Sequence, residues 1–458
     1  DRLRRVTRMV SVTVWLIVGG IVGFLQAFAI GANDVANAFG TSVGSKVLTV
    51  RWAIILGSIF EFLGASLLGG SVSGSIVSSV VNPDEFSDDV FAEGMVATSA
   101  STALWLIIAT LLGLPVSTTH SVIGALAGFG LAQAGTRGIS WWPLGRIGIS
   151  WIISPILGGL IGFVAFKGVL LAQLHVWPRP DRRAVMLTTV VGLTLCFYSI
   201  TISLHVLPLI HLATVYIAAV AGFFLLAGLA GAWFGYLPWL MKTNPHNIYD
   251  DDKEHTSGEI TQDDTETSSH LPAEDLDALS ADKPLLGAES LRLPPKRSFR
   301  ELQIVTACCV ALAHGSNDVG NAVGPFYEIY RRAPGAQSKL PLWILVIAGA
   351  AIALGLALLG HRVMKTIGTK ITHLSPIHGF CAEFAASVLV LICSELKLPI
   401  STTQILVGSV MGVGVAEHGI RAVQWRTLGN IAGSWLATLP FSCGVGALVS
   451  FILSRAIK

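Results

Sequence analysis

The decapeptide GANDVANAFG occupies residues 31–40, and a diverged copy, GSNDVGNAVG, occupies residues 315–324. A second motif also occurs twice, as LPVSTT at residues 114–119 and as LPISTT at residues 398–403. In both cases the second copy lies 284 residues after the first. Because two unrelated motifs share one offset, the sequence indicates an internal duplication of the chain.

The composition is that of an integral membrane protein. Of the 458 residues, 52% are apolar and 13% are charged, and the mean hydropathy is +0.68. Soluble domains carry about 25% charged residues, so lipid is the expected surrounding of this chain. The net charge of +2 comes without a basic stripe, and nothing in the sequence indicates a nucleic-acid partner.

Apolar segments of spanning length predict an all-α polytopic fold with about twelve transmembrane segments. They lie near residues 10–30, 50–72, 91–113, 120–134, 144–166, 184–204, 212–236, 300–313, 340–360, 375–394, 404–416 and 427–454. Three of them, 120–134, 300–313 and 404–416, are shorter than the roughly 20 residues that a full crossing needs. We expect these three to be broken or re-entrant half-helices.

A polar segment divides the membrane region into two halves. Residues 242–300 contain 13 of the 28 acidic residues, with many Ser, Thr and Pro residues, and we expect a disordered acidic loop there. The predicted parts are therefore an N-terminal membrane half, 1–241, the loop, and a C-terminal membrane half, 301–458. The distribution of Lys and Arg favours a cytoplasmic position for the loop only slightly.

The relative orientation of the two halves follows from the number of spans between the copies. Seven predicted spans separate the first Asn-Asp motif from the second, and an odd number inverts the second copy in the membrane. The sequence therefore predicts inverted-topology repeats with a site at their interface near the midplane. A re-entrant Pro-Ser-Thr-Thr element leaves this parity unchanged, whereas a simple kink within one span would reverse it.

Asp34 and Asp318 follow apolar runs, where an ionised carboxylate is unfavourable by several kcal/mol unless it is paired or hydrated. Neither residue has Lys or Arg nearby in the sequence, which favours a bound metal cation or a proton as its partner. On a helix, Asn33, Asp34 and Asn37 converge on one face. Asn317, Asp318 and Asn321 repeat the arrangement. Oxygen donors of this kind suit a hard ion such as sodium.

The two Ser-Thr-Thr triplets, residues 117–119 and 401–403, have groups that can bind an anion. Pro fits the first turn of a helix, and hydroxyls beside free backbone N–H groups form an anion site at a helix N-terminus. A single copy of such a motif is commonly only a helix cap, and its recurrence favours the functional interpretation. The first triplet is followed by His120 and the second by Gln404, so the two copies differ chemically.

Other ionisable residues lie within predicted spans. Glu61 and Glu383 are each either an ion or proton ligand or a carboxylate facing a polar interior, and they do not correspond under the 284-residue offset. His314, His373 and His378 lack metal-ligand spacing, which favours polar contacts over metal ligation.

On these motifs the chain resembles the inorganic phosphate transporter family often called PiT, whose hallmark is a duplicated GANDVANA-type motif. The likeness covers both membrane halves. It implies sodium-coupled symport in most members and proton coupling in some, with outward-facing termini and a homodimer. Carried over by motif, phosphate ligands are Asn33, Asn317, Ser117, Thr118, Thr119, Ser401, Thr402 and Thr403. Cation ligands are Asp34, Asn37, Asp318 and Asn321, with Na⁺ at Asp34 and Asp318.

The sequence thus predicts a secondary active transporter that carries inorganic phosphate with Na⁺, or alternatively H⁺, by alternating access and without a cofactor. A passive oxyanion channel and a phosphate sensor or receptor are the alternatives. An enzyme is disfavoured, because no nucleophile with a paired base and no nucleotide loop is present. We expect a multi-pass protein of the plasma membrane, with an organelle envelope as the alternative location.

Overall fold

The computed structural model of the chain describes residues 2–34, 36–69, 75–176, 296–337, 340–370, 374–395 and 400–456, and the regular elements in these ranges are helices. The first half contains α1 (Arg2–Asp34), α2 (Ala36–Gly44), α3 (Val50–Leu68), α4 (Ser75–Val80), α5 (Asp88–Leu111), α6 (Thr118–Ala134) and α7 (Trp141–Val176), with the 3₁₀ turns η2 (Pro83–Glu85) and η3 (Gly135–Gly138). The second half contains α12 (Lys296–Tyr330), α13 (Leu342–Leu359), α14 (His361–Lys370), α15 (Pro376–Glu395), α16 (Thr402–His418), the 3₁₀ turn η5 (Ile420–Ala422) and α17 (Trp425–Ala456).

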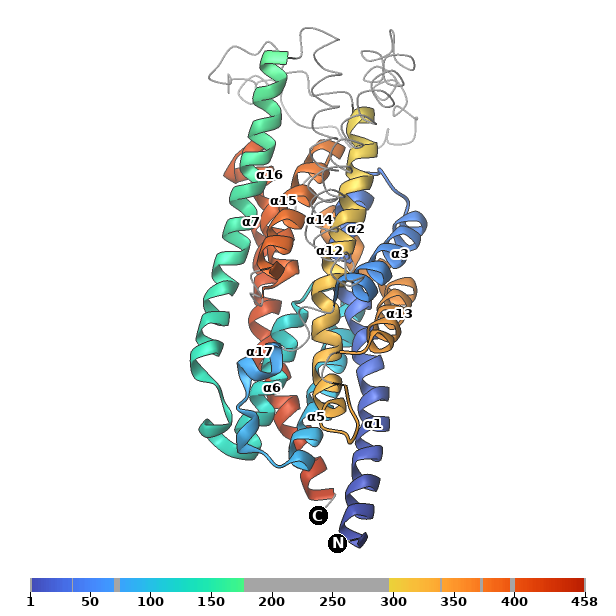
Figure 1. Cartoon of the computed structure of the whole chain (residues 1–458). Helices are drawn as coiled ribbons and strands as arrows, with labels where there is room; N and C mark the ends of the chain where they lie inside the picture. The colour runs from blue at the N-terminus through green and yellow to red at the C-terminus, as the bar shows by residue number, and fades with distance from the viewer. Residues whose placement is uncertain are drawn as a thin grey trace, which may run out of the picture.

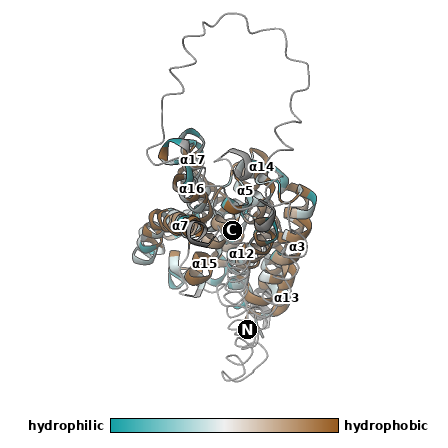
Figure 2. Cartoon of the chain, turned by 90° about the horizontal axis from the view of Figure 1, so that it is seen from above, coloured by the Kyte–Doolittle hydropathy of each residue, from teal (hydrophilic) through white to brown (hydrophobic). Residues whose placement is uncertain are grey.

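The helices form an elongated bundle of membrane type (Figure 1). Within the described ranges, seven helical stretches have the length and the apolar composition that a bilayer crossing requires. Seen from above, α3, α7 and α13 lie at the periphery and carry largely hydrophobic residues (Figure 2). The polytopic helical fold is thereby confirmed. The predicted spans 184–204 and 212–236 and most of the predicted loop 242–300 lie outside the described residues, so the total of about twelve stays a prediction.

Two of the three predicted half-helices are short helices in the structure. Helices α6 and α16 have 17 residues each and begin directly after the Ser of each triplet. The third prediction, a half-helix at 300–313, is wrong, because α12 continues for 35 residues through the second Asn-Asp motif. In the first half, α1 reaches Asp34 and α2 begins at Ala36, and both belong to the apolar helical stretch Val12–Gly44, which is long enough to cross a membrane. Polar residues lowered the hydropathy of α12 without interrupting its backbone.

Corresponding helices of the two halves run in opposite directions (Figure 1). Helix α1 rises from the N-terminus at the bottom of this view, whereas α12 descends from the top. Helix α7 rises, whereas α17 descends to the C-terminus. Local contacts repeat as well: the indole N–H of Trp141 donates to the Thr136 carbonyl over 3.1 Å, and that of Trp425 donates to the Ile420 carbonyl over 3.0 Å. An inverted-topology repeat requires this arrangement, and the inversion across a membrane stays a prediction.

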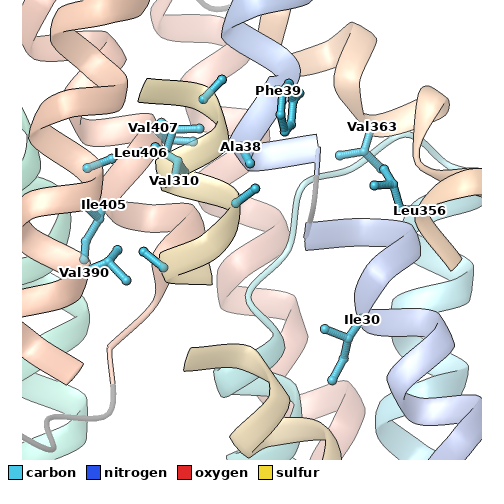
Figure 3. Packing of buried hydrophobic residues seen from close by; sticks show 14 of the residues in the cluster. Ile30, Ala38, Phe39, Val310, Leu356, Val363, Val390, Ile405, Leu406 and Val407 are labelled. Atoms are coloured by element: carbon cyan, nitrogen blue, oxygen red, sulfur yellow. The ribbon is translucent and has the colours of Figure 1, made fainter. Parts of the chain in front are cut away.

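The glycines that begin the two Asn-Asp motifs allow close helix packing. Gly31 of α1 packs against the backbone of Ile352 in α13, and Gly315 of α12 packs against the backbone of Glu61 in α3. Apolar side chains from both halves, including Ile30 and Phe39 on one side and Val310 and Leu406 on the other, form one buried cluster around them (Figure 3). Small residues at such crossings are typical of membrane bundles.

We expect Gly31→Val to destabilise the fold. A Cβ at Gly31 would lie 2.6 Å from the carbonyl carbon of Ile352, so the two helices would have to separate. Overpacking of this kind destabilises proteins by about 1–3 kcal/mol and occasionally more. The matched control is Gly145→Val in α7, where a Cβ would meet nothing within 4 Å. Thermal unfolding of the purified variants in detergent measures the difference, and equal midpoints would contradict the close packing.

Candidate ion-binding site

The Ser of each triplet caps its own helix. Ser117 is the N-cap of α6 and its hydroxyl accepts from the backbone N–H of His120 over 3.3 Å. Ser401 is the N-cap of α16 and accepts from the backbone N–H of Gln404, also over 3.3 Å. Capping fixes the first turns of both helices and leaves the other N-terminal amide groups directed out of the helix end.

Asp34 lies between the two triplets. The Thr118 hydroxyl donates to Oδ2 of Asp34, and the Thr403 hydroxyl lies 3.1 Å from Oδ1. Thr118 belongs to the first half and Thr403 to the second, so this carboxylate joins the two helix N-termini. Nδ2 of Asn37 is 3.4 Å from the same Oδ1. Asp34 is buried, with 1% of its surface exposed.

Asp318 has a related but looser set of contacts. Asn317 and Asn321 each donate to its Oδ1 over 3.1 Å, and the hydroxyl of Thr402 is 3.5 Å from Oδ2. The pair Thr402 and Asp318 is the counterpart, at the 284-residue offset, of Thr118 and Asp34. Each motif therefore places its carboxylate against the second hydroxyl of its own triplet.

Reciprocal contacts connect the two copies across the interface. Asn37 donates to the hydroxyl of Thr403 over 2.7 Å, and Asn321 donates to that of Thr119 over 3.2 Å. Thr119 donates to the carbonyl of Ile400 over 3.0 Å, and the Thr403 hydroxyl lies 3.3 Å from the carbonyl of Val116. Exchanging the two repeats converts each contact into the other. The structure thus brings both predicted acid-amide clusters and both triplets into one buried site.

His314, for which the sequence favours polar contacts over metal ligation, also lies in this site. Nε2 of His314 is 2.7 Å from Oδ2 of Asp318, and its Nδ1 is 2.9 Å from Oε1 of Glu61. Ligand atoms of Asp34, His314 and Asp318 lie within 4.8 Å of one another, close enough to hold one metal ion. The spacing of four residues between His314 and Asp318 on a helix was the available sequence signal.

The His314–Glu61 contact has no counterpart in the first half. Gly315 packs on Glu61 as Gly31 packs on Ile352, which makes Ile352 the structural equivalent of Glu61. The residue equivalent to His314 at the 284-residue offset is Ile30. The two acid clusters therefore differ: hydroxyl groups surround Asp34, whereas Asp318 is also joined to an imidazole and a second carboxylate.

Two amide oxygens in the site accept no hydrogen bond from the described residues. These are Oδ1 of Asn37 and Oδ1 of Asn321, each in a side chain with 1% of its surface exposed. Buried polar atoms normally have a partner, and an unpaired acceptor is unfavourable by about 1–3 kcal/mol. A buried amide oxygen that accepts no hydrogen bond is suited to coordinating a cation, and in this structure the Nδ2 groups of both residues are the atoms that contact the carboxylates.

Asn33 makes a different set of contacts from its counterpart. Its Nδ2 donates to the hydroxyl of Thr110 and to the carbonyl of Leu114, both over 3.0 Å, and its Oδ1 accepts from the N–H of Val116 over 3.1 Å. Both amide hydrogens and the oxygen are thus engaged with the segment that leads into α6. In this structure Asn33 positions that segment, and its predicted role as a phosphate ligand requires these contacts to open.

Glu383 forms a separate polar cluster. Its Oε1 accepts from Thr41, Ser42 and Gln303 over 2.5, 2.8 and 3.2 Å, and its Oε2 accepts from Thr306 over 2.6 Å. These donors are neutral and come from α2 and α12. Glu61 thus joins the Asp34–Asp318 site through His314, whereas the hydrogen bonds of Glu383 involve different residues.

Comparison with known proteins agrees with this geometry. Residues 30–446 match the model of the phosphate transporter family. The chain is 36% identical to a protein named as a phosphate permease of Thermococcus kodakarensis, over 97% of this chain and 98% of that protein. It is 35% identical to the chloroplastic inorganic phosphate transporter 2-1 of Arabidopsis thaliana, over 96% of this chain and 72% of that protein.

A solved structure is also similar. The chain superposes on a protein described as the sodium-dependent phosphate transporter with a TM-score of 0.78 and 33% sequence identity, covering 96% of this chain and 99% of that chain. The family match spans most of the chain and includes both Asn-Asp motifs and both triplets. This multi-pass membrane protein, which is not an enzyme, therefore belongs to the phosphate transporter family.

Proposed function

We propose that this protein carries inorganic phosphate across a membrane in symport with a cation, Na⁺ in the first instance. The observation that supports this most is the position of Asp34 and Asp318, two buried carboxylates that meet the N-termini of two short helices from opposite halves. An anion cannot approach two ionised carboxylates unless positive charge comes with it. The name of the similar solved structure, which includes sodium dependence, agrees with this interpretation.

The phosphate site in this proposal is formed by the tips of α6 and α16. The N-terminal N–H groups of both helices carry partial positive charge, and Thr118, Thr119, Thr402 and Thr403 add hydroxyl donors. Ser117 and Ser401 contribute by holding the tips in shape, since their hydroxyls act as caps in this structure. Neutral donors of this kind recognise a tetrahedral oxyanion by shape and charge.

The cation sites are formed by oxygen atoms on either side of this anion site. Around Asp34 these are its carboxylate, the hydroxyls of Thr118 and Thr403, and the unpaired amide oxygen of Asn37. The set around Asp318 includes Asn321 Oδ1 and is supplemented by His314. Na⁺ binds preferentially to hard oxygen ligands of this kind.

Proton coupling is the second candidate, and one observation favours it. His314 lies between two carboxylates, Asp318 and Glu61, and can carry a proton that neutralises one of them. Such a proton would replace one of the two cations, so the half with His314 and the half without it need not bind the same ion.

Alternating access follows from the electrostatics. With both carboxylates neutralised and phosphate bound, the assembly carries little net charge and the two halves can move against each other; without cations the charges of the two buried carboxylates remain uncompensated. Each surplus positive charge moved across the membrane gains about 2.3 kcal/mol per 100 mV.

We assign the protein to the plasma membrane as a homodimer; an organelle envelope is the alternative, since the Arabidopsis relative is named as chloroplastic.

Cation coupling is tested by phosphate uptake into proteoliposomes with Na⁺ replaced by choline, at pH 6 and at pH 8. We expect uptake to require Na⁺ at pH 8. If His314 carries a coupling proton, part of the uptake should persist in choline at pH 6. Liposomes without protein provide the background. Undiminished uptake in choline at both pH values would refute cation coupling and favour a passive oxyanion channel.

A further inference from the structure

An apolar cavity lies on the outer side of α1, α12 and α13, apart from the ion-binding contacts. Its volume is about 390 Å³. Its lining includes Gly20, Phe24, Phe326, Trp343 and Ile347. Ligand pockets usually have about 300–1,000 Å³ and contain a few precisely placed polar groups. The lining of this cavity contains no charged side chain, and the indole of Trp343 is its only polar side-chain group, so its ligand must be a hydrocarbon.

The cavity exists because α1 lacks side chains at this crossing. A Cβ at Gly20 would lie 3.6 Å from Phe326, which is ordinary contact distance, and a larger side chain there would extend into the free space. Gly23 has a similar position, with a Cβ 3.4 Å from the Cβ of Phe326. At Gly31 the backbone of another helix occupies the place of a side chain. At Gly20 and Gly23 no backbone atom does so, and the space that a side chain would fill stays open.

The cavity opens toward the surface that faces the bilayer. Ile21, Leu25 and Ile347 line it and also remain between 47% and 59% exposed. Helices α1 and α13 are both long and apolar enough to cross a membrane. At this surface the surrounding medium is the acyl chains of lipids, and an empty apolar gap of this size would lose the contacts of every atom that lines it.

One end of the cavity has the residues typical of a headgroup region. Trp343 lines the cavity and is the second residue of α13. Its ring lies edge-to-face with that of Tyr330, the last residue of α12, with 6.0 Å between the ring centroids. Arg331 follows directly; its Nε and Nη2 donate to Glu328 over 2.8 and 2.7 Å, and 43% of its side chain remains exposed. Trp, Tyr and Arg gather where hydrocarbon meets the polar headgroups. A lipid phosphate near Arg331 would therefore place its acyl chain along the cavity.

We propose that this cavity is a binding site for one acyl chain of a membrane phospholipid. The chain would lie between α1 and α12 and reach Ala322, which directly follows the site residue Asn321. The lipid would then be an integral part of the packing behind the ion-binding site, in contrast to the exchanging lipids that surround the other helices.

The test uses the full-length protein in vesicles that contain phosphatidylcholine with a photoactivatable diazirine in the middle of one acyl chain. After irradiation, mass spectrometry of peptides locates the attached lipid. We expect several times more label on the cavity residues of α1 and α13 than on the exposed face of α17. The variant Gly20→Leu should reduce the label at the cavity several-fold, because leucine fills the gap.

The matched control is Gly433→Leu in α17, at an exposed position where a Cβ would meet nothing within 4 Å, and it should leave the labelling of the cavity unchanged. Equal labelling of α1, α13 and α17 in the unaltered protein would show only bulk lipid and would overturn the proposal. Absence of lipid label from the cavity residues would overturn it as well. The distribution in the unaltered protein decides the question even if Gly20→Leu does not fold.

Discussion

Replacement of Asp34 or Asp318 by Asn is expected to reduce sodium-driven phosphate uptake by at least about a hundredfold. Asn has nearly the same shape as Asp but cannot neutralise a cation. Contacts to a charged group are worth about 1.5–3 kcal/mol each, and every 1.4 kcal/mol changes an equilibrium tenfold. Loss of two such contacts to a bound cation therefore corresponds to about 3 kcal/mol or more. Phosphate should then lose one of the two cations that compensate its charge in the site.

The two single variants and the double variant also separate the transport mechanisms. A symporter should stop in all three, because the anion cannot enter without its cations. A passive oxyanion channel should still conduct, since α6 and α16 and their hydroxyl groups remain. The matched control is Asp84→Asn, an exposed aspartate in η2, which should retain normal uptake. Uptake within twofold of the unaltered protein in the double variant would remove these carboxylates from the coupling mechanism.

The duplicated motifs predicted the central arrangement of the site for a physical reason. An Asp at the end of an apolar run needs partners, and the Ser-Thr-Thr triplets were the other polar groups placed in apolar surroundings twice. Helix caps are local, so Ser117 and Ser401 could be placed at helix starts from sequence. Contacts such as Asn37 with Thr403, 366 residues apart, follow from the two repeats packing face to face.

Other features could not be derived from local sequence. A drop in hydropathy at Asn317 and Asp318 looks like a helix end, but α12 continues through both residues, and Asn317 and Asn321 donate to Asp318 within this helix. The offset of 284 residues pairs Glu61 with Leu345, whereas the packing of Gly31 and Gly315 pairs it with Ile352. The spacing between the motif helix and the next helix differs in the two halves, and only three-dimensional contacts reveal this.

The role of Asn33 illustrates the same limit. Its motif position is equivalent to that of Asn317, yet Asn33 holds the segment before α6 through Thr110, Leu114 and Val116. Asn317 instead donates to Asp318 and accepts from Ser394 over 3.3 Å. Identical residues in a duplicated motif thus have different partners: Asn33 contacts the end of α5 and the segment that leads into α6, whereas Asn317 contacts its own helix and α15.

Replacement of His314 alone should destabilise the protein strongly. In His314→Ile, which introduces the residue that the first half has at Ile30, both Glu61 and Asp318 would keep their burial and lose their shared partner. Removing one member of a buried charged group destabilises proteins by about 3–5 kcal/mol, because the remaining charge is uncompensated. We expect a clear fall in the midpoint of thermal unfolding in detergent, measured without phosphate.

The double variant His314→Ile with Glu61→Ile should recover most of that stability. It copies the apolar pair Ile30 and Ile352 of the first half, and well-packed apolar replacements of buried ionic groups are often neutral or stabilising. If His314 and Glu61 take part in cation or proton binding, phosphate uptake should remain low in the double variant even though its stability is recovered. Uptake in choline at pH 6 should then be absent. Recovery of both stability and uptake would show that this contact serves packing alone, and the asymmetry between the two halves would then have no part in coupling.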